Sequence, residues 1–201
     1  MAAARSPAPA PALAVRHHVD PDELSLCRRL AREACALMEG VEVGMGSKSG
    51  DLFGEFFIAA NSDEPAPEAI DEALIRSKFG GTIFPPATIT VEPLAERGTW
   101  WAEVVADSGG DVEDEDDEDD GDGDGPLDRW RALICWFCDQ PEFLAWSFVR
   151  IGDSARLQQL SQSDFPPGTV IPGCVLPRLA VGLTRGGSLA GIFGASVQTE
   201  L

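Results

Sequence analysis

Two cysteines with the C-x-x-C spacing, Cys135 and Cys138, are the residues of this chain best suited to chemistry. The spacing fits a redox pair or half of a zinc site. A redox pair is typical of a helix start, where free N–H groups stabilise a thiolate, whereas this pair falls late in an amphipathic segment. A zinc site would need two further ligands at matching spacing, and the other cysteines and both histidines form no second C-x-x-C. We therefore interpret the pair as structural, with Cys138 on a core face. We expect no metal and no cofactor, and a thiol-based redox protein is the alternative.

Two other segments resemble ligand-binding loops without meeting their requirements. Asp116, Glu118 and Asp120 are spaced like the start of a calcium loop, but Leu127 stands where the bidentate glutamate is needed. Residues 44–50, G-M-G-S-K-S-G, look like a phosphate loop but lack its spacing and follow a helix instead of preceding one. We expect neither segment to be a specific ligand site.

The residue types give little support to a catalytic role. The chain has no tyrosine, and its two histidines, His17 and His18, both fall near the N-terminus. A histidine-based triad or general base is therefore not expected. We predict a protein that is not an enzyme and has no catalytic residues.

Helical periodicity predicts three helices. The first begins at Asp20, a capping residue, with Pro21 at the first helical position, and it ends at Gly40. The second is expected over about residues 67–78 and the third over 127–139. The intervening segment, residues 93–104, is expected to be helical or irregular.

Strand patterns are expected over residues 53–60, 88–91 and 143–151, and in two apolar runs on either side of Arg185-Gly186-Gly187. The Gly-Gly pair between those two runs predicts a C-terminal β-hairpin, because glycine accepts the positive φ of tight turns. The strands are apolar on both faces, which indicates a sheet covered by helices on both sides. The expected fold is therefore α/β, a three-layer α/β/α sandwich with a mixed or antiparallel sheet.

The C-terminal segment resembles the hairpin of the nuclease A inhibitor family, whose members block sugar-nonspecific, metal-dependent nucleases. The matching residues share a G-x-T turn start, an L-A-G-I run and a strand that ends in threonine: Gly182, Leu183, Thr184, Gly187, Ser188, Leu189, Ala190, Gly191, Ile192, Val197 and Thr199. The family fold is a three-layer α/β/α sandwich, in agreement with the fold expected from the strand patterns.

The resemblance extends upstream over most of residues 20–199. The family's Ser-x-Ser loop and first strand are matched by Ser47-Lys48-Ser49 and Phe53–Ile58. The family also has a tryptophan before the middle helix, and Trp100 or Trp101 stands at that position. Leu37-Met38 look like the end of its N-terminal helix.

The resemblance implies a stoichiometric protein inhibitor that directs an acidic or carboxylate group toward the metal site of a nuclease. In the family, the terminal threonine and an acidic residue of the Ser-x-Ser loop have this role. Here Lys48 takes the acidic position, Asp51 is a nearby substitute, and the chain continues past Thr199. The expected partner-binding residues are Thr199, Glu200, Leu201, Ser47, Lys48, Ser49, Asp51 and Trp100. Because Lys48 inverts the charge, the alternative is a protein-interaction module of the same fold with a non-nuclease partner.

The charge of the chain is consistent with such a partner. The formal net charge is −19, which argues against direct nucleic-acid binding, since phosphates are neutralised by lysine and arginine. An acidic protein would be steered toward a nuclease or another protein with a basic surface. No apolar run reaches the length of a membrane helix, so we expect a soluble protein with no membrane partner.

Composition divides the chain into three parts. Residues 1–19 are rich in alanine and proline and are expected to be a disordered tail, with a weak organelle-targeting signal as the alternative. Residues 20–201 are expected to form a single domain. Within it, residues 109–125 form an acidic insertion, expected to be disordered, in which Asp111–Gly125 carries eleven acidic residues. The five cysteines, an odd number in a long chain, indicate reduced thiols and a cytoplasmic location.

Overall fold

The computed structural model describes residues 19–43, 52–61, 63, 65–83, 87–107, 125–152 and 174–198 of the chain. In chain order the elements are α1 (Pro21–Leu37), β1 (Gly54–Ile58), α2 (Glu72–Lys78), β2 (Ile89–Pro93), the short 3-10 helix η1 (Leu94–Glu96), α3 (Thr99–Asp107), α4 (Pro126–Asp139), β3 (Phe143–Ile151), β4 (Cys174–Thr184) and β5 (Leu189–Gln198). The tail before residue 19 and the acidic insertion up to residue 124 lie outside the described residues.

Helix α1 begins where its sequence predicts and ends at Leu37, three residues before the expected end at Gly40. The carboxylate of Asp20 accepts a hydrogen bond of 2.8 Å from the backbone N–H of Asp22, and Pro21 occupies the first helical turn. The helix is followed by Gly40, whose φ of 80° suits glycine. Its buried residues recur every three or four positions: Cys27, Leu30, Ala31 and Ala34.

The second helix is shorter than expected. The side chain of Asp71 accepts a hydrogen bond of 2.7 Å from the N–H of Leu74, so α2 starts at Glu72 and not near residue 67. The segment expected to be helical or irregular is divided by Arg97, whose φ is 42°. This left-handed residue ends η1, and α3 starts two residues later.

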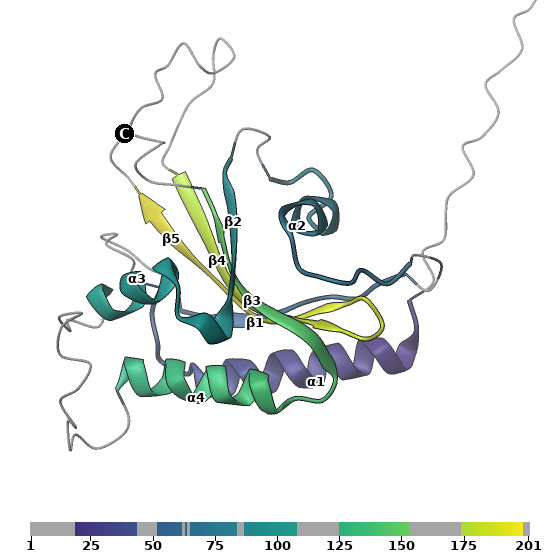
Figure 1. The fold of residues 1–201 in the computed structure, drawn as a ribbon, viewed down its shortest axis with the longest axis horizontal. Coiled ribbons are helices and arrows are strands. Elements are labelled where there is room, and N and C mark those ends of the chain that lie inside the picture. Colours follow the sequence, from purple (N-terminus) through teal and green to yellow (C-terminus); the bar gives the residue numbers. More distant parts are fainter. Residues whose placement is uncertain are drawn as a thin grey trace, which may run out of the picture.

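The five strands form one sheet in the order β1-β5-β4-β3-β2, and every neighbouring pair is antiparallel. Figure 1 shows α1 and α4 beside each other against one side of this sheet, with α2 on the other side. The chain therefore has a mixed α/β fold with an open antiparallel sheet. Strands β4 and β5 are joined by a tight turn in which Gly187 has a φ of 83°.

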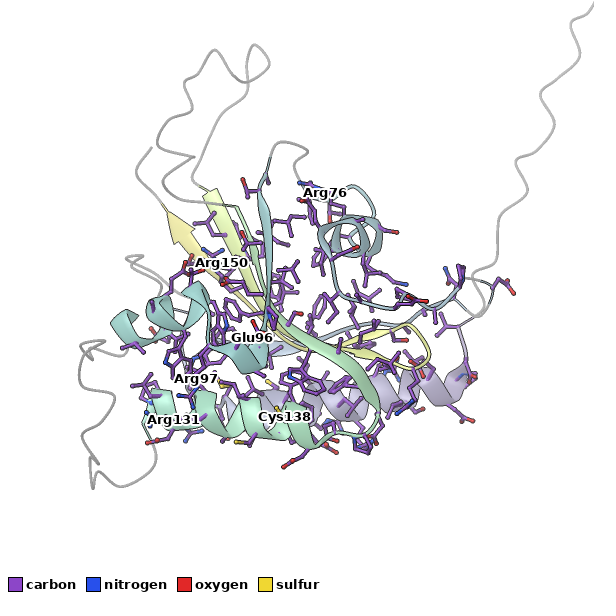
Figure 2. All side chains as sticks on the ribbon, viewed as in Figure 1. Arg76, Glu96, Arg97, Arg131, Cys138 and Arg150 are labelled. Atoms are coloured by element: carbon purple, nitrogen blue, oxygen red, sulfur yellow. The ribbon has the colours of Figure 1, made fainter. Side chains whose placement is uncertain are left out.

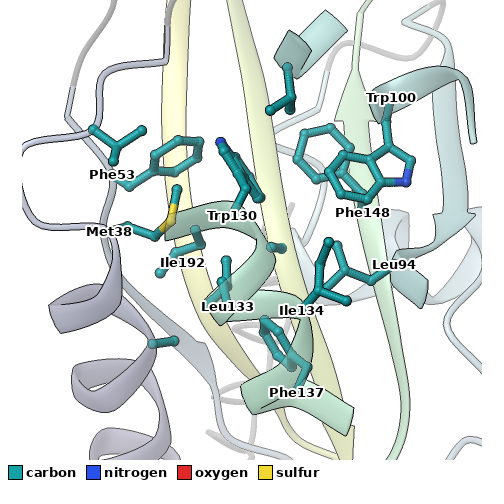
Figure 3. Packing of buried hydrophobic residues seen from close by; sticks show 14 of the residues in the cluster. Met38, Phe53, Leu94, Trp100, Trp130, Leu133, Ile134, Phe137, Phe148 and Ile192 are labelled. Atoms are coloured by element: carbon teal, nitrogen blue, oxygen red, sulfur yellow. The ribbon is translucent and has the colours of Figure 1, made fainter. Parts of the chain in front are cut away.

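A hydrophobic cluster lies on each face of the sheet. On the side of α1 and α4, the indole of Trp130 packs edge-on against Phe53 and Phe148, with ring centroids 5.3 and 5.7 Å apart (Figure 3). On the side of α2, Ile75 joins a second cluster of strand residues, in which Leu179 is also fully buried. Residues on alternate positions of β5 divide between these clusters, as the sequence pattern predicts.

Strand β3 departs from the simple alternation expected of it. Its pairing with β4 shifts in register between Phe143 and Ala145. Because of this irregularity, Phe143 joins the same cluster as Phe148, although positions five residues apart lie on opposite faces of a regular strand. Leu144 would share a face with Phe148 in a regular strand, but its side chain is 45% exposed.

Candidate partner-binding site

Most of the expected contact residues lie in two segments outside the described residues. Trp100 is the exception, and the structure also describes the residues that flank both segments. The residues outside the described ranges are Ser47, Lys48, Ser49, Asp51, Thr199, Glu200 and Leu201. The structure therefore describes where these segments are attached to the fold.

The two ends of the 44–51 segment are held together. Glu42 and Leu52 form an antiparallel bridge, and the N–H of Phe53 donates a hydrogen bond of 3.4 Å to the carbonyl of Val41. Val43 and Phe53 are both buried. The segment thus leaves and rejoins the fold at a single place.

That place adjoins the final strand. Strand β1 pairs with β5 only as far as Phe193, and the next residue, Gly194, faces Val43 and Phe53. From Gly194, β5 continues along β4 to Gln198, whose partner is Cys174. Four residues of strand span about 13 Å, so the attachment points of both segments lie at one end of the sheet.

Gly194 lies where the ends of the 44–51 segment, Val43 and Phe53, contact strand β5. We predict that a side chain at residue 194 disturbs the packing of both the segment ends and the strand. A methyl group on Gly194 would overlap Val43 Cγ2 and lie 3.0 Å from Phe53 Cδ1. Gly194→Ala is therefore expected to lower the free energy of unfolding by about 2 kcal/mol, measured by urea denaturation. The control is Gly54→Ala, because a methyl group there meets only the Phe193 carbonyl oxygen, at 4.0 Å. Equal stabilities for the two variants would contradict the close packing at Gly194.

A cluster of charged residues lies near this end of the sheet, between α3 and the strands. The guanidinium of Arg150 forms ion pairs with Glu92, at 2.7 Å, and with Glu103. Glu92 also accepts a hydrogen bond of 2.9 Å from the N–H of Thr99, the first residue of α3. Figure 2 shows Arg150 in this position beside β2 and α3. Glu92 therefore stabilises the start of α3, since carboxylates are favoured at a helix N-terminus.

Arg178 on β4 extends the charged cluster toward β5. Its side chain is 7% exposed, and its Nε lies 3.9 Å from Glu103 Oε2. Two arginines and two glutamates balance in charge, so the cluster offers no net positive charge to a phosphate. Its signal in the sequence is a single arginine inside each of two apolar strands, Arg150 in β3 and Arg178 in β4.

Trp100 lies in the core and not on the surface. Its side chain is fully buried, and its ring stacks on Phe148 with centroids 4.8 Å apart. Trp101 packs edge-on against it at 5.5 Å and is 4% exposed. The indole of Trp100 would have to leave the core to contact a partner, so its position indicates a structural residue.

The cysteines differ from the expected arrangement. Cys138, expected on the core face of α4, is exposed, as is Cys135. The buried face of α4 instead includes Leu133. Desolvation raises the pKa of the Cys138 thiol, and the neighbouring Cys135 and Asp139 raise it further.

The thiol of Cys27 is buried against the sheet side of α1. Burial raises its pKa to about 11, although a hydrogen bond with Ser188 opposes the shift.

Over the part of the chain that the structure describes, no three His, Cys, Asp or Glu side chains are grouped to hold a metal ion. Within the same residues, none of the helices combines the length and the hydropathy required to cross a membrane.

No protein-family model matches the sequence, and no curated protein matches it.

Proposed function

We propose that this chain is a non-catalytic protein that binds and stoichiometrically inhibits a metal-dependent, sugar-nonspecific nuclease. The observation that carries the proposal is the meeting of Val43 and Phe53 with Gly194. Through this contact, the segment that contains the Ser47-Lys48-Ser49 loop and the strand that leads to Thr199 are attached at one end of the sheet. A single partner surface could therefore meet both segments.

The charge of the chain supports the same kind of partner. A net charge of −19 favours association with a protein whose active-site groove is basic, as a groove that binds nucleic acid must be. The balanced charges around Arg150 and Arg178 are consistent with a protein that does not itself bind nucleic acid. We propose the cytoplasm as its location, on the basis of an odd number of cysteines.

We also propose that the fold is a three-layer α/β/α sandwich with a C-terminal β-hairpin. The clusters on the two faces of the sheet, one around Trp130 and one around Ile75, support the three layers. The antiparallel pairing of β4 with β5 across a tight turn supports the hairpin. In this arrangement the hairpin brings Gln198, the last described residue of β5, to the same end of the sheet as Val43.

The second candidate function is an interaction module with a non-nuclease partner. Lys48 favours it, because a cation at this position would be repelled by a catalytic metal ion. The test that separates the two is an activity assay of a metal-dependent, sugar-nonspecific nuclease with increasing amounts of this chain. Activity that falls to zero near one chain per nuclease supports inhibition. Full activity at micromolar excess would favour the interaction module.

Lys48→Glu should strengthen inhibition. The substitution supplies a loop carboxylate that the metal ion attracts, and we expect about tenfold less protein to be needed for half-inhibition. The control is Lys78→Glu at the end of α2, which makes the same change in net charge on another element. If both variants improve equally, the gain comes from long-range steering by net charge and not from a contact of residue 48.

A further inference from the structure

The exposed cysteines of α4 lie on one stripe of the helix. Cys135 and Cys138 are three residues apart, and Arg131 precedes Cys135 by one turn. All three are on the outward side, whereas Trp130, Ile134 and Phe137 face the core. Figure 2 shows Arg131 and Cys138 along the same helix. Positions three residues apart on a helix have Cβ atoms about 5–6 Å apart, close enough for both sulfurs to bind one ion.

Because both thiols are exposed, Cys135 and Cys138 are not packing residues of the core. A buried Cys138 would have been a packing residue, but an exposed thiol contributes little to a core. Thiolates are soft ligands that favour zinc, which takes four ligands in a tetrahedron. Within the described residues, α4 supplies two thiols and no third or fourth ligand gathers near them. Among the residues that the structure describes, one chain therefore supplies only half of the ligands for such a site.

We propose that Cys135 and Cys138 of two copies of this chain together bind one zinc ion in a tetrahedral site with four thiolates. No electron is transferred: each of the four thiols releases its proton to solvent, and each sulfur forms one bond to the ion. The missing ligands that argued against zinc in the sequence are supplied by the second copy. The proposal does not depend on nuclease inhibition.

The charges on the stripe favour a symmetric approach of two such helices. Arg131 lies before the cysteines and Asp139 lies after them. When two copies of α4 meet antiparallel, the cation of each approaches the carboxylate of the other, as a self-complementary two-fold interface requires. The existing ion pair of Arg131 with Asp128 is at the surface, with both side chains more than 40% exposed, so it can be exchanged at little cost.

The test is the molar mass and the zinc content of the full chain, kept reduced with a phosphine and measured with and without added zinc chloride. We expect zinc to double the molar mass and to bind at about half an ion per chain. A chelator should return the protein to monomers. Cobalt in place of zinc should give the charge-transfer absorption of a tetrahedral thiolate site.

Four variants complete the experiment: two single cysteine-to-serine substitutions on α4, their combination, and a control on α1. Cys135→Ser and Cys138→Ser should each abolish zinc-dependent dimerisation, while the control Cys35→Ser, a half-buried thiol on α1, should leave it unchanged. The proposal is overturned if the chain stays monomeric with zinc, or binds one zinc per chain without dimerising. It is equally overturned if the double serine variant still dimerises with zinc.

Discussion

Gly191→Ala is expected to lower the free energy of unfolding by about 3 kcal/mol, as an overpacking change against backbone that cannot move aside. Gly191 lies opposite Val181 in the β4–β5 ladder. A methyl group on it would overlap the Ala180 carbonyl oxygen and lie 3.0 Å from Val181 Cα. Both strands are central in the sheet, so the clash has to be relieved by separating them.

Urea denaturation of Gly191→Ala and the Gly54→Ala control measures this effect. The control adds the same methyl group to the edge strand β1, where the nearest atom is 4.0 Å away, and we expect its stability to match that of the unmodified chain. A loss of less than about 1 kcal/mol for Gly191→Ala would mean that β4 and β5 can separate locally at small cost. Such a result would contradict the close packing of β5 against β4 at Gly191.

Removal of Thr199-Glu200-Leu201 is expected to abolish nuclease inhibition, whereas removal of Glu200 and Leu201 alone is expected to preserve or improve it. The shorter truncation leaves a chain that ends at Thr199, as in the family that the C-terminal segment resembles. A charge-assisted contact at the partner's metal ion is worth about 2–5 kcal/mol, so losing it should raise the half-inhibitory concentration by at least about 30-fold.

Thermal unfolding of both truncated chains provides the control. All three residues follow the last described residue of β5, so neither truncation removes a described core residue. We therefore expect similar melting temperatures for the two truncated chains and the full chain. If the longer truncation inhibits as well as the full chain, the C-terminal tip is not the contact and another surface must bind the nuclease.

Features set by neighbouring residues could be predicted from the sequence. The start of α1 at Asp20-Pro21 and the strand Phe143–Ile151 agree with the structure, since a cap and a long apolar run act locally. The turn between β4 and β5 follows from Gly187 for the same reason. The start of α2 was misplaced because Pro67 and Asp71 both offer start signals, and only the structure shows that Asp71 forms the cap.

Features set by contacts between distant segments could not be predicted. Glu92 and Arg150 are far apart in the sequence and meet only because β2 pairs with β3. The exposure of Cys138 depends on how α4 is rotated about its own axis. This rotation is set by packing against the sheet, and a change of one residue in the buried face would turn Cys138 inward or outward. The contact of Val43 with Gly194 likewise requires that the end of β5 extend beyond β1.

Hydrogen exchange of the chain with and without a bound nuclease tests most directly whether one end of the sheet is the partner surface. We expect slower exchange on binding in two peptides, one spanning Val43–Phe53 and one covering the end of β5 with Thr199. Exchange in α2 and along the outward face of α4 should not change. Slower exchange confined to α2 or α4 would contradict a partner surface at this end of the sheet. Unchanged exchange throughout the chain, with both proteins mixed at micromolar concentration, would contradict it as well.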